Sequence, residues 1–152
     1  MSYGIIFGVT PLITLEGWLV EASLGGFSRS VSVSRGCPQG GVLLPLLWCL
    51  VISELLVRLN EGGVYSQGYA DDICLLAVGI FPNTVSGLIQ WALHTIEVWC
   101  DELGLSVNPD KTGLVAFTRR NKLRGFFEPH LFGTTLHHSM SVKYLGVTWI
   151  HG

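Results

Sequence analysis

Two adjacent carboxylates are the side chains of this sequence best suited to catalysis. Asp71 and Asp72 lie between two short strand-like runs at 64–69 and 73–78. Runs of this kind predict strands, so the two aspartates should lie at the tip of a β-hairpin. Carboxylates held together at a tight turn can bind divalent cations that also contact phosphate groups, as metal-assisted phosphoryl transfer requires. The alternative is an ordinary β-turn, because aspartate is a favoured turn residue without any metal.

Two helices are predicted, one on each side of this hairpin in the sequence. The first spans 43–60, with Pro45 where a first helical turn tolerates proline and Gly62 after its end. The second spans 84–103, where apolar residues recur at helical spacing before Gly104. Each helix can therefore pack an apolar face against the sheet that contains the hairpin.

The remaining strands complete an α+β pattern. Residues 23–34 end in strict alternation of valine and serine, which predicts a half-buried strand with a hairpin around Gly25. Further short strands are predicted at 114–118, 131–136 and 142–150. The resulting order is βαββαβ followed by extra strands, one form of the ferredoxin-like split βαβ arrangement. Two helices would then cover one face of an antiparallel sheet and leave the other face free for a substrate.

The composition fits one compact domain but supplies no electrostatic signature of a nucleic-acid-binding protein. Apolar residues make up 49% of the 152 residues, which is enough for a buried core, and the formal net charge is −2. A free-standing protein that binds DNA or RNA usually carries a basic face. Composition alone therefore argues against this class.

Other classes also lack support in the sequence. The four cysteines include no Cys-x-x-Cys pair, which argues against zinc-ribbon and thioredoxin folds. The apolar run at 42–52 is well short of the roughly 20 residues that span a bilayer, so no membrane segment is expected. The N-terminus has no basic leader, which indicates an intracellular protein without distinguishing nucleus from cytoplasm.

Four segments resemble the motifs of reverse transcriptases and occur in the family's order. They are 34–43 (Gly-Cys-Pro-Gln-Gly), 68–72 (Tyr-Ala-Asp-Asp), 104–112 (Leu-Ser-Val-Asn-Pro-Asp-Lys-Thr) and 143–147 (Tyr-Leu-Gly). One such motif is a weak signal, but four in order on a matching plan of helices and strands favour common ancestry. The wording is most similar to non-LTR, Jockey-like retrotransposons, and retroviral enzymes are a poorer match.

The resemblance implies the palm of an RNA-directed DNA polymerase. Such an enzyme joins a primer 3′-hydroxyl to a dNTP with two Mg²⁺ ions, or possible Mn²⁺ substitutes, on an RNA template and a DNA primer. It also implies that Asp71 and Asp72 are catalytic metal ligands and that Tyr69 lies along the primer or template.

Further residues receive roles from the same resemblance. Gln39 and Gly40 would lie near template and nucleotide. Lys111 would be the catalytic cation near the triphosphate, although a solvated turn lysine is the alternative. Tyr144 and Gly146 would help to grip the primer strand, for which a plain strand end is an equally good structural account.

The sequence departs from the family in features that catalysis needs. The family also uses an aspartate on a strand upstream of the Pro-Gln-Gly motif, yet no aspartate precedes Asp71. Leu44 stands before Pro45 where related elements usually have serine. Residues 1–152 are therefore expected to be a partial reverse transcriptase domain, a palm without the N-terminal fingers, the first aspartate motif or the thumb.

These departures leave a second hypothesis open. The chain could be a catalytically inactive palm remnant or an interaction module that uses the open sheet. In either case its partners could include a chaperone, or a separate polypeptide that supplies the missing polymerase segments.

Overall fold

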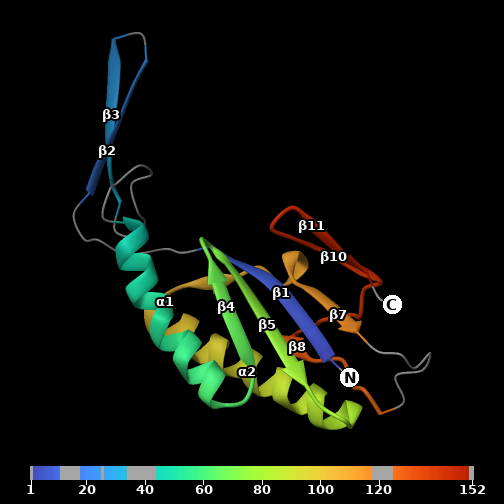
Figure 1. The fold of residues 1–152 in the computed structure, drawn as a ribbon. Coiled ribbons are helices and arrows are strands. Elements are labelled where there is room, and N and C mark those ends of the chain that lie inside the picture. The colour runs from blue at the N-terminus through green and yellow to red at the C-terminus, as the bar shows by residue number, and fades with distance from the viewer. Residues whose placement is uncertain (1, 11–17, 25, 34–43, 118–124, 151–152) are drawn as a thin grey trace.

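An antiparallel sheet forms the centre of the chain in a computed structural model that describes residues 2–10, 18–24, 26–33, 44–117 and 125–150 (Figure 1). Its strands run in the order β4–β5–β1, and β6 and β7 both pair with the other edge of β1. The strands are β1 (Ser2–Thr10), β4 (Tyr65–Tyr69), β5 (Asp72–Val78), β6 (Ser106–Val107) and β7 (Gly113–Phe117). The middle of the sheet is therefore formed by the N-terminal strand.

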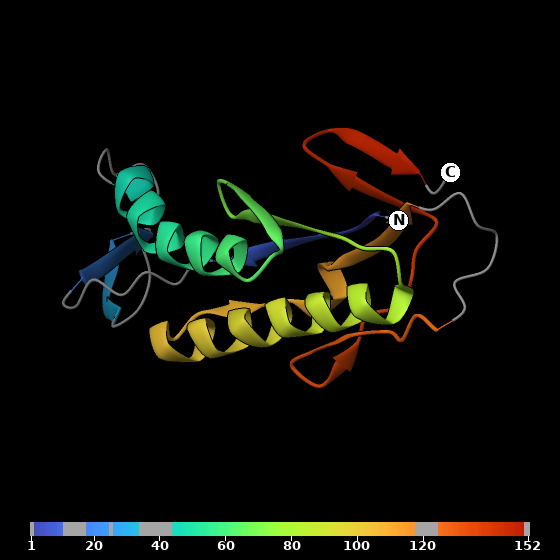
Figure 2. The same cartoon turned by 60° about the horizontal axis from the view of Figure 1, so that its bottom comes forward.

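Two helices cover one face of this sheet, as Figure 2 shows from the side. They are α1 (Leu44–Glu61) and α2 (Pro82–Leu103), and α2 ends at Gly104, whose φ of 65° is left-handed. Alternate residues of β5, including Ile73 and Leu75, are fully buried beneath the helices together with Leu55 of α1 and Ile89 of α2. The two predicted helices and the α+β class are confirmed.

The opposite face of the sheet carries a second hairpin, formed by β10 (Ser141–Tyr144) and β11 (Val147–Ile150) (Figure 2). The prediction of one strand across 142–150 was wrong, because Leu145 and Gly146 both have positive φ and reverse the chain in two residues. A Cβ added to Gly113 of β7 would lie 2.5 Å from Val142 Cγ2, so β10 approaches the sheet closely there. The face expected to be free is thus partly covered.

The first strand of the predicted order was placed wrongly. The pattern at 23–34 does form a hairpin, between β2 (Trp18–Leu24) and β3 (Phe27–Val33). This hairpin pairs with none of the other strands that the structure describes, and it projects from the body near the start of α1 (Figure 1). A two-stranded hairpin can satisfy its own ladder, so local alternation does not say which sheet it joins. The first strand of the central sheet is β1.

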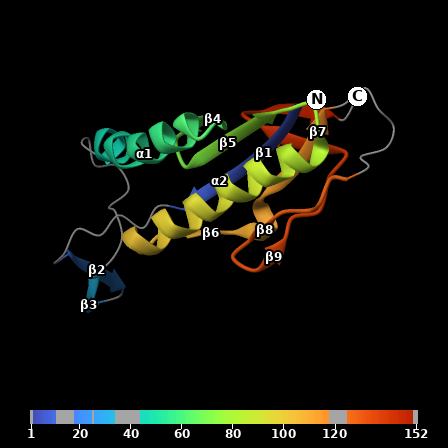
Figure 3. The same ribbon diagram turned by 90° about the horizontal axis from the view of Figure 1, so that it is seen from below.

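Polar side chains of α2 are hydrogen-bonded to the segment that contains β8 and β9, which lies beside this helix (Figure 3). Gln90 exchanges two hydrogen bonds with the backbone of His130, of 3.1 and 2.7 Å, and Glu97 accepts from the Phe132 N–H. The run predicted as one strand at 131–136 is a small hairpin of β8 (His130–Leu131) and β9 (Thr134–Thr135). Its turn residues, Phe132 and Gly133, again have positive φ.

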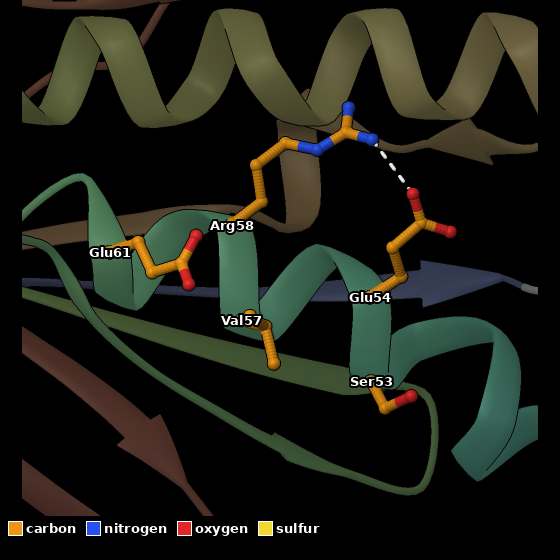
Figure 4. Close-up of a pocket in the computed structure, with 5 residues that line it drawn as sticks. All are labelled: Ser53, Glu54, Val57, Arg58 and Glu61. Atoms are coloured by element: carbon orange, nitrogen blue, oxygen red, sulfur yellow. Dashed lines mark hydrogen bonds and ion pairs between the residues drawn. The ribbon is translucent and has the colours of Figure 1, made fainter.

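The outer face of α1 leaves apolar side chains in solvent. Leu46 is 59% exposed, Leu50 62% and Val57 56%. Val57 lines a shallow hollow of about 310 Å³, and all the residues that line it belong to α1. Figure 4 shows these side chains, among them the ion pair between Arg58 and Glu54, which are 2.9 Å apart. Within the described residues no helix is long and apolar enough to cross a membrane.

We expect these exposed leucines to promote self-association. Replacing Leu46 and Leu50 together with glutamine should shift the chain toward monomer in gel filtration with light scattering. The free energy of unfolding should change by no more than about 0.5 kcal/mol, because neither side chain is buried. Leu103→Gln, at the last residue of α2 and 42% exposed, is the control that should leave self-association unchanged. An unaltered elution profile of the double variant would contradict the prediction.

Candidate functional site

The tip of the β4–β5 hairpin holds the two aspartates, as predicted. Tyr69 and Asp72 are the last paired residues of the hairpin, and Ala70 and Asp71 form the turn between them. Ala70 has a φ of 50°, which is unusual for a residue with a Cβ. Asp71 is exposed and Asp72 half-buried, so both carboxylates are accessible at one end of the sheet.

A tryptophan that the sequence did not single out for this site contacts the same turn. The indole N–H of Trp48, on α1, donates a hydrogen bond to the Ala70 carbonyl. Trp48 also packs against Trp99 of α2, with ring centroids 6.3 Å apart and the planes tilted by 59°. Both tryptophans fall within the two predicted helix ranges, but their contact joins residues far apart in the chain and could not be predicted from spacing.

The strand beside Asp72 carries no carboxylate. In the register of β1 and β5, Asp72 pairs with Gly8, and the next two residues of β1, Val9 and Thr10, pair with β6. The sequence of β1, Ser-Tyr-Gly-Ile-Ile-Phe-Gly-Val-Thr, includes no aspartate or glutamate. The position directly across from the aspartate pair is therefore filled by glycine.

Lys111 lies beyond the other edge of β1, at the same end of the sheet. It ends the short 3₁₀ helix η1 (Pro109–Lys111), which connects β6 to β7. Asn108 shapes this turn, since its Oδ1 accepts from the Asp110 N–H at 2.9 Å and its carbonyl accepts from Thr112 Oγ1 at 3.1 Å. Because β1 intervenes, the Lys111 segment and the aspartates are about two strand spacings, or roughly 10 Å, apart.

The aspartate pair partly fits a divalent cation. Burial, and then the nearby charge of Asp71, raise the pKa of Asp72, which indicates that the two carboxylates are close enough to repel. A cation would relieve this repulsion, and Mg²⁺ is commonly held by one or two carboxylates together with substrate phosphates. Among the described residues, however, no group of three or more His, Cys, Asp or Glu side chains could hold a metal ion.

The raised pKa of Asp72 predicts how stability depends on pH. A raised carboxyl pKa favours the protonated folded state, so without metal Asp72 lowers stability above its folded pKa and not below the unfolded value near 3.8. We expect Asp72→Asn to raise the melting temperature at neutral pH and to lose this advantage as the pH falls toward 3.8. Asp110→Asn, at an exposed turn, is the control. A melting-temperature difference for Asp72→Asn that did not vary with pH would contradict this account.

Tyr144 is the last residue of β10, and its side chain lies between the β10–β11 hairpin and the sheet. The sequence predicted a primer contact for this residue. It is 9% exposed, and it lines a cavity of about 210 Å³ between that hairpin and the sheet, with Tyr65, Gln67, Cys74, Leu76, Phe117, Val142 and Trp149. Its hydroxyl is buried and has no hydrogen-bond partner among the described residues. Burial, and then the neighbouring Cys74, raise its pKa, so the phenol stays neutral.

The other predicted substrate residues differ in their surroundings. Tyr69 is 61% exposed beside the aspartates, which leaves its ring available to a ligand. Gly146 has a φ of 78° in the turn of the β10–β11 hairpin, a role that needs no substrate. Gln39 and Gly40 lie outside the described residues.

Tyr144→Phe should increase stability. Removing a buried hydroxyl that lacks a partner removes its desolvation cost, so the free energy of unfolding should rise by about 1–2 kcal/mol in urea titrations. Tyr65→Phe, at a side chain 59% exposed on the same cavity, should change it by less than about 0.5 kcal/mol. A loss of stability in Tyr144→Phe would show that the hydroxyl is hydrogen-bonded in solution.

A sheet backed by two helices, with paired aspartates at the tip of its β4–β5 hairpin, defines the class of polymerase palms. The chain belongs to the reverse transcriptase family, since the family model described as "Reverse transcriptase (RNA-dependent DNA polymerase)" matches residues 7–149. Relatives of the chain include a protein of an R1 element and the RNA-directed DNA polymerases of jockey elements, which are non-LTR retrotransposons.

Three of these relatives show the extent of the similarity. The retrovirus-related Pol polyprotein from type-1 retrotransposable element R1 2 of Nasonia vitripennis is 35% identical over 51% of this chain and 19% of its own length. The putative 115 kDa protein in element R1DM of Drosophila melanogaster is 32% identical over 80% of the chain and 12% of its own length. The RNA-directed DNA polymerase from mobile element jockey of Drosophila funebris is 30% identical over 87% and 15%. The chain thus spans less than a fifth of these relatives.

Proposed function

We propose that this chain supplies the palm of an RNA-directed DNA polymerase, in which Asp71 and Asp72 are ligands for Mg²⁺ or Mn²⁺. The parent reaction would transfer a nucleotide from a dNTP to the 3′-hydroxyl of a DNA primer on an RNA template. The observation that carries the proposal is the aspartate pair at the hairpin tip, in a chain of this family. Bound cations would neutralise developing charge and align the attacking and leaving oxygens.

The surrounding residues suit this role in distinct ways. Tyr69, exposed next to Asp71, can stack on a base or sugar of the primer or template. Lys111, at the same end of the sheet, would neutralise the triphosphate. Gln39 and Gly40 are assigned to template and nucleotide, and Tyr144 and Gly146 to the primer-gripping hairpin. For Tyr144 burial favours an indirect contribution, in which its ring supports the hairpin that meets the primer.

The absence of a carboxylate from β1 favours a second function. Without a third acidic ligand beside Asp72, both cation affinity and alignment of the reacting oxygens should fall by orders of magnitude. The chain would then be a catalytically inactive palm, a partial reverse transcriptase domain that serves at most as an interaction module. A chaperone, or a polypeptide with the remaining polymerase segments, would be its expected partner.

Primer extension distinguishes the two functions. The purified chain is given a DNA primer on an RNA template, dNTPs, and a titration of Mg²⁺ or Mn²⁺, beside Asp71→Asn and the matched variant Asp101→Asn. Asp101 is an exposed residue in the last turn of α2 and is not part of the hairpin tip. Incorporation that is lost in Asp71→Asn and kept in Asp101→Asn would support the polymerase. Its absence at every metal concentration would support the inactive palm.

A further inference from the structure

The turn that carries the aspartate pair accepts a hydrogen bond from a side chain of helix α1. Trp48 is 8% exposed on α1, and its indole N–H reaches across to the Ala70 carbonyl, 22 positions along the chain. Within the described residues no other side chain is hydrogen-bonded to the backbone of residues 69–72. The hydrogen bond therefore links the first helix directly to the peptide that precedes Asp71.

Ala70 is the residue of this turn that needs such support. Its φ of 50° lies in the left-handed region, which is unfavourable for a residue with a Cβ and is adopted readily only by glycine. Rotating the Ala70 peptide out of this conformation would change the direction of its carbonyl and the placement of Asp71 and Asp72, which follow it. A donor fixed on the carbonyl opposes that rotation.

Trp48 is itself held in place. Its ring packs at 6.3 Å, centroid to centroid, against Trp99 of α2, which is only 3% exposed. The chain of contacts runs from α2 through Trp99 and Trp48 to Ala70 and ends at the aspartate pair. The packing of both helices therefore affects the turn through the indole N–H of Trp48.

We propose that Trp48 is a positioning residue for the aspartate pair, acting through the Ala70 carbonyl and not through substrate. This inference rests on the proposed metal-binding role of Asp71 and Asp72, whereas the hydrogen bond from Trp48 to Ala70 does not depend on that role. The simpler account is that Trp48 only fills the core. The two accounts differ on one atom, because core filling needs the ring and positioning needs the N–H.

Trp48→Phe keeps an aromatic ring and removes the donor, and Trp99→Phe makes the same change in the neighbouring ring, which has no bond to the turn. Both variants should unfold cooperatively, which thermal unfolding checks. In metal-free full-length chain, hydrogen exchange at residues 69–73 should become about three- to tenfold faster in Trp48→Phe than in Trp99→Phe. Equal exchange in the two variants would overturn the proposal.

Metal affinity supplies a readout that loss of core packing would not move selectively. Mn²⁺ binding, followed by the electron paramagnetic resonance of the free ion, should be about three- to tenfold weaker in Trp48→Phe than in Trp99→Phe. If wild type also fails to bind Mn²⁺, the proposed metal site is wrong, and the exchange comparison in metal-free protein still decides the role of Trp48.

Ala70→Gly tests the same link from the side of the turn. Glycine adopts the left-handed conformation without a Cβ penalty, so the turn should depend less on the indole donor. In the Ala70→Gly background, Trp48→Phe should accelerate exchange at residues 69–73 less than it does in wild type. An undiminished effect would show that the hydrogen bond does not act through the conformation of Ala70, and would overturn that part of the proposal.

Discussion

Gly8→Asp should raise the affinity of the chain for Mn²⁺ by at least about tenfold, because it adds a third carboxylate to the aspartate pair. Gly8 of β1 pairs directly with Asp72 of β5 in the antiparallel register. Directly paired residues place their Cβ atoms about 4.5–5.5 Å apart on the same face of a sheet, which is within reach of a shared cation. Titration calorimetry with Mn²⁺ and with Mg²⁺ measures the gain, and primer extension shows whether activity rises with it.

Gly4→Asp is the matched control for charge. Gly4 lies four residues earlier in β1, pairs with Leu76, and is therefore roughly 13 Å from Gly8 along the strand. It adds the same charge on the same face at a distance that no shared cation can bridge. Equal affinity for Mn²⁺ in the two variants would refute the assignment by register. Asp71→Asn in the Gly8→Asp background should remove the gain.

The two helices and the hairpin that carries the aspartates could be predicted because their signals are local. A proline lies near the start of α1, a glycine follows α2, and apolar residues recur at helical spacing. These signals predict helices without any tertiary contact. The β4–β5 hairpin is similarly marked by two short strand-like runs around the aspartates. These elements position Asp71 and Asp72, so the tip of the candidate site followed from sequence alone.

The central strand could not be predicted in the same way. Residues Ser2–Thr10 include two glycines and no clear alternation, and their strand conformation depends on partners in β5, β6 and β7 that lie far along the chain. The hairpin of β2 and β3 has the better local pattern and was assigned the place in the sheet that β1 takes. Local propensity identifies a strand, but only non-local pairing says where the strand goes.

The β10–β11 hairpin and Trp48 were missed for related reasons. Leucine rarely adopts positive φ, so the pair Leu145 and Gly146 carries only half of the signal of a two-residue turn. The bond from Trp48 to Ala70 joins two elements whose approach depends on the whole packed layer. A tryptophan on an apolar helix face is otherwise indistinguishable from ordinary core.

Leu55→Ala should destabilise the chain by about 2–5 kcal/mol, which is a large part of the 5–15 kcal/mol typical of a small domain. Leu55 is fully buried on the inner face of α1, in the same core as Ile73 of β5 and Ile89 of α2. Truncation leaves a cavity where helix and sheet meet, because the surrounding side chains can relax only partly. Urea unfolding followed by circular dichroism measures the loss.

Leu50→Ala makes the same truncation on the outer face of the same helix, at a side chain 62% exposed. It should change the free energy of unfolding by no more than about 0.5 kcal/mol, because little apolar surface returns to water. Similar losses in the two variants would mean that α1 does not pack on the sheet through its Leu55 face. The positioning role of Trp48 would then be wrong as well, since its indole lies on the same face of α1 and bonds the Ala70 carbonyl.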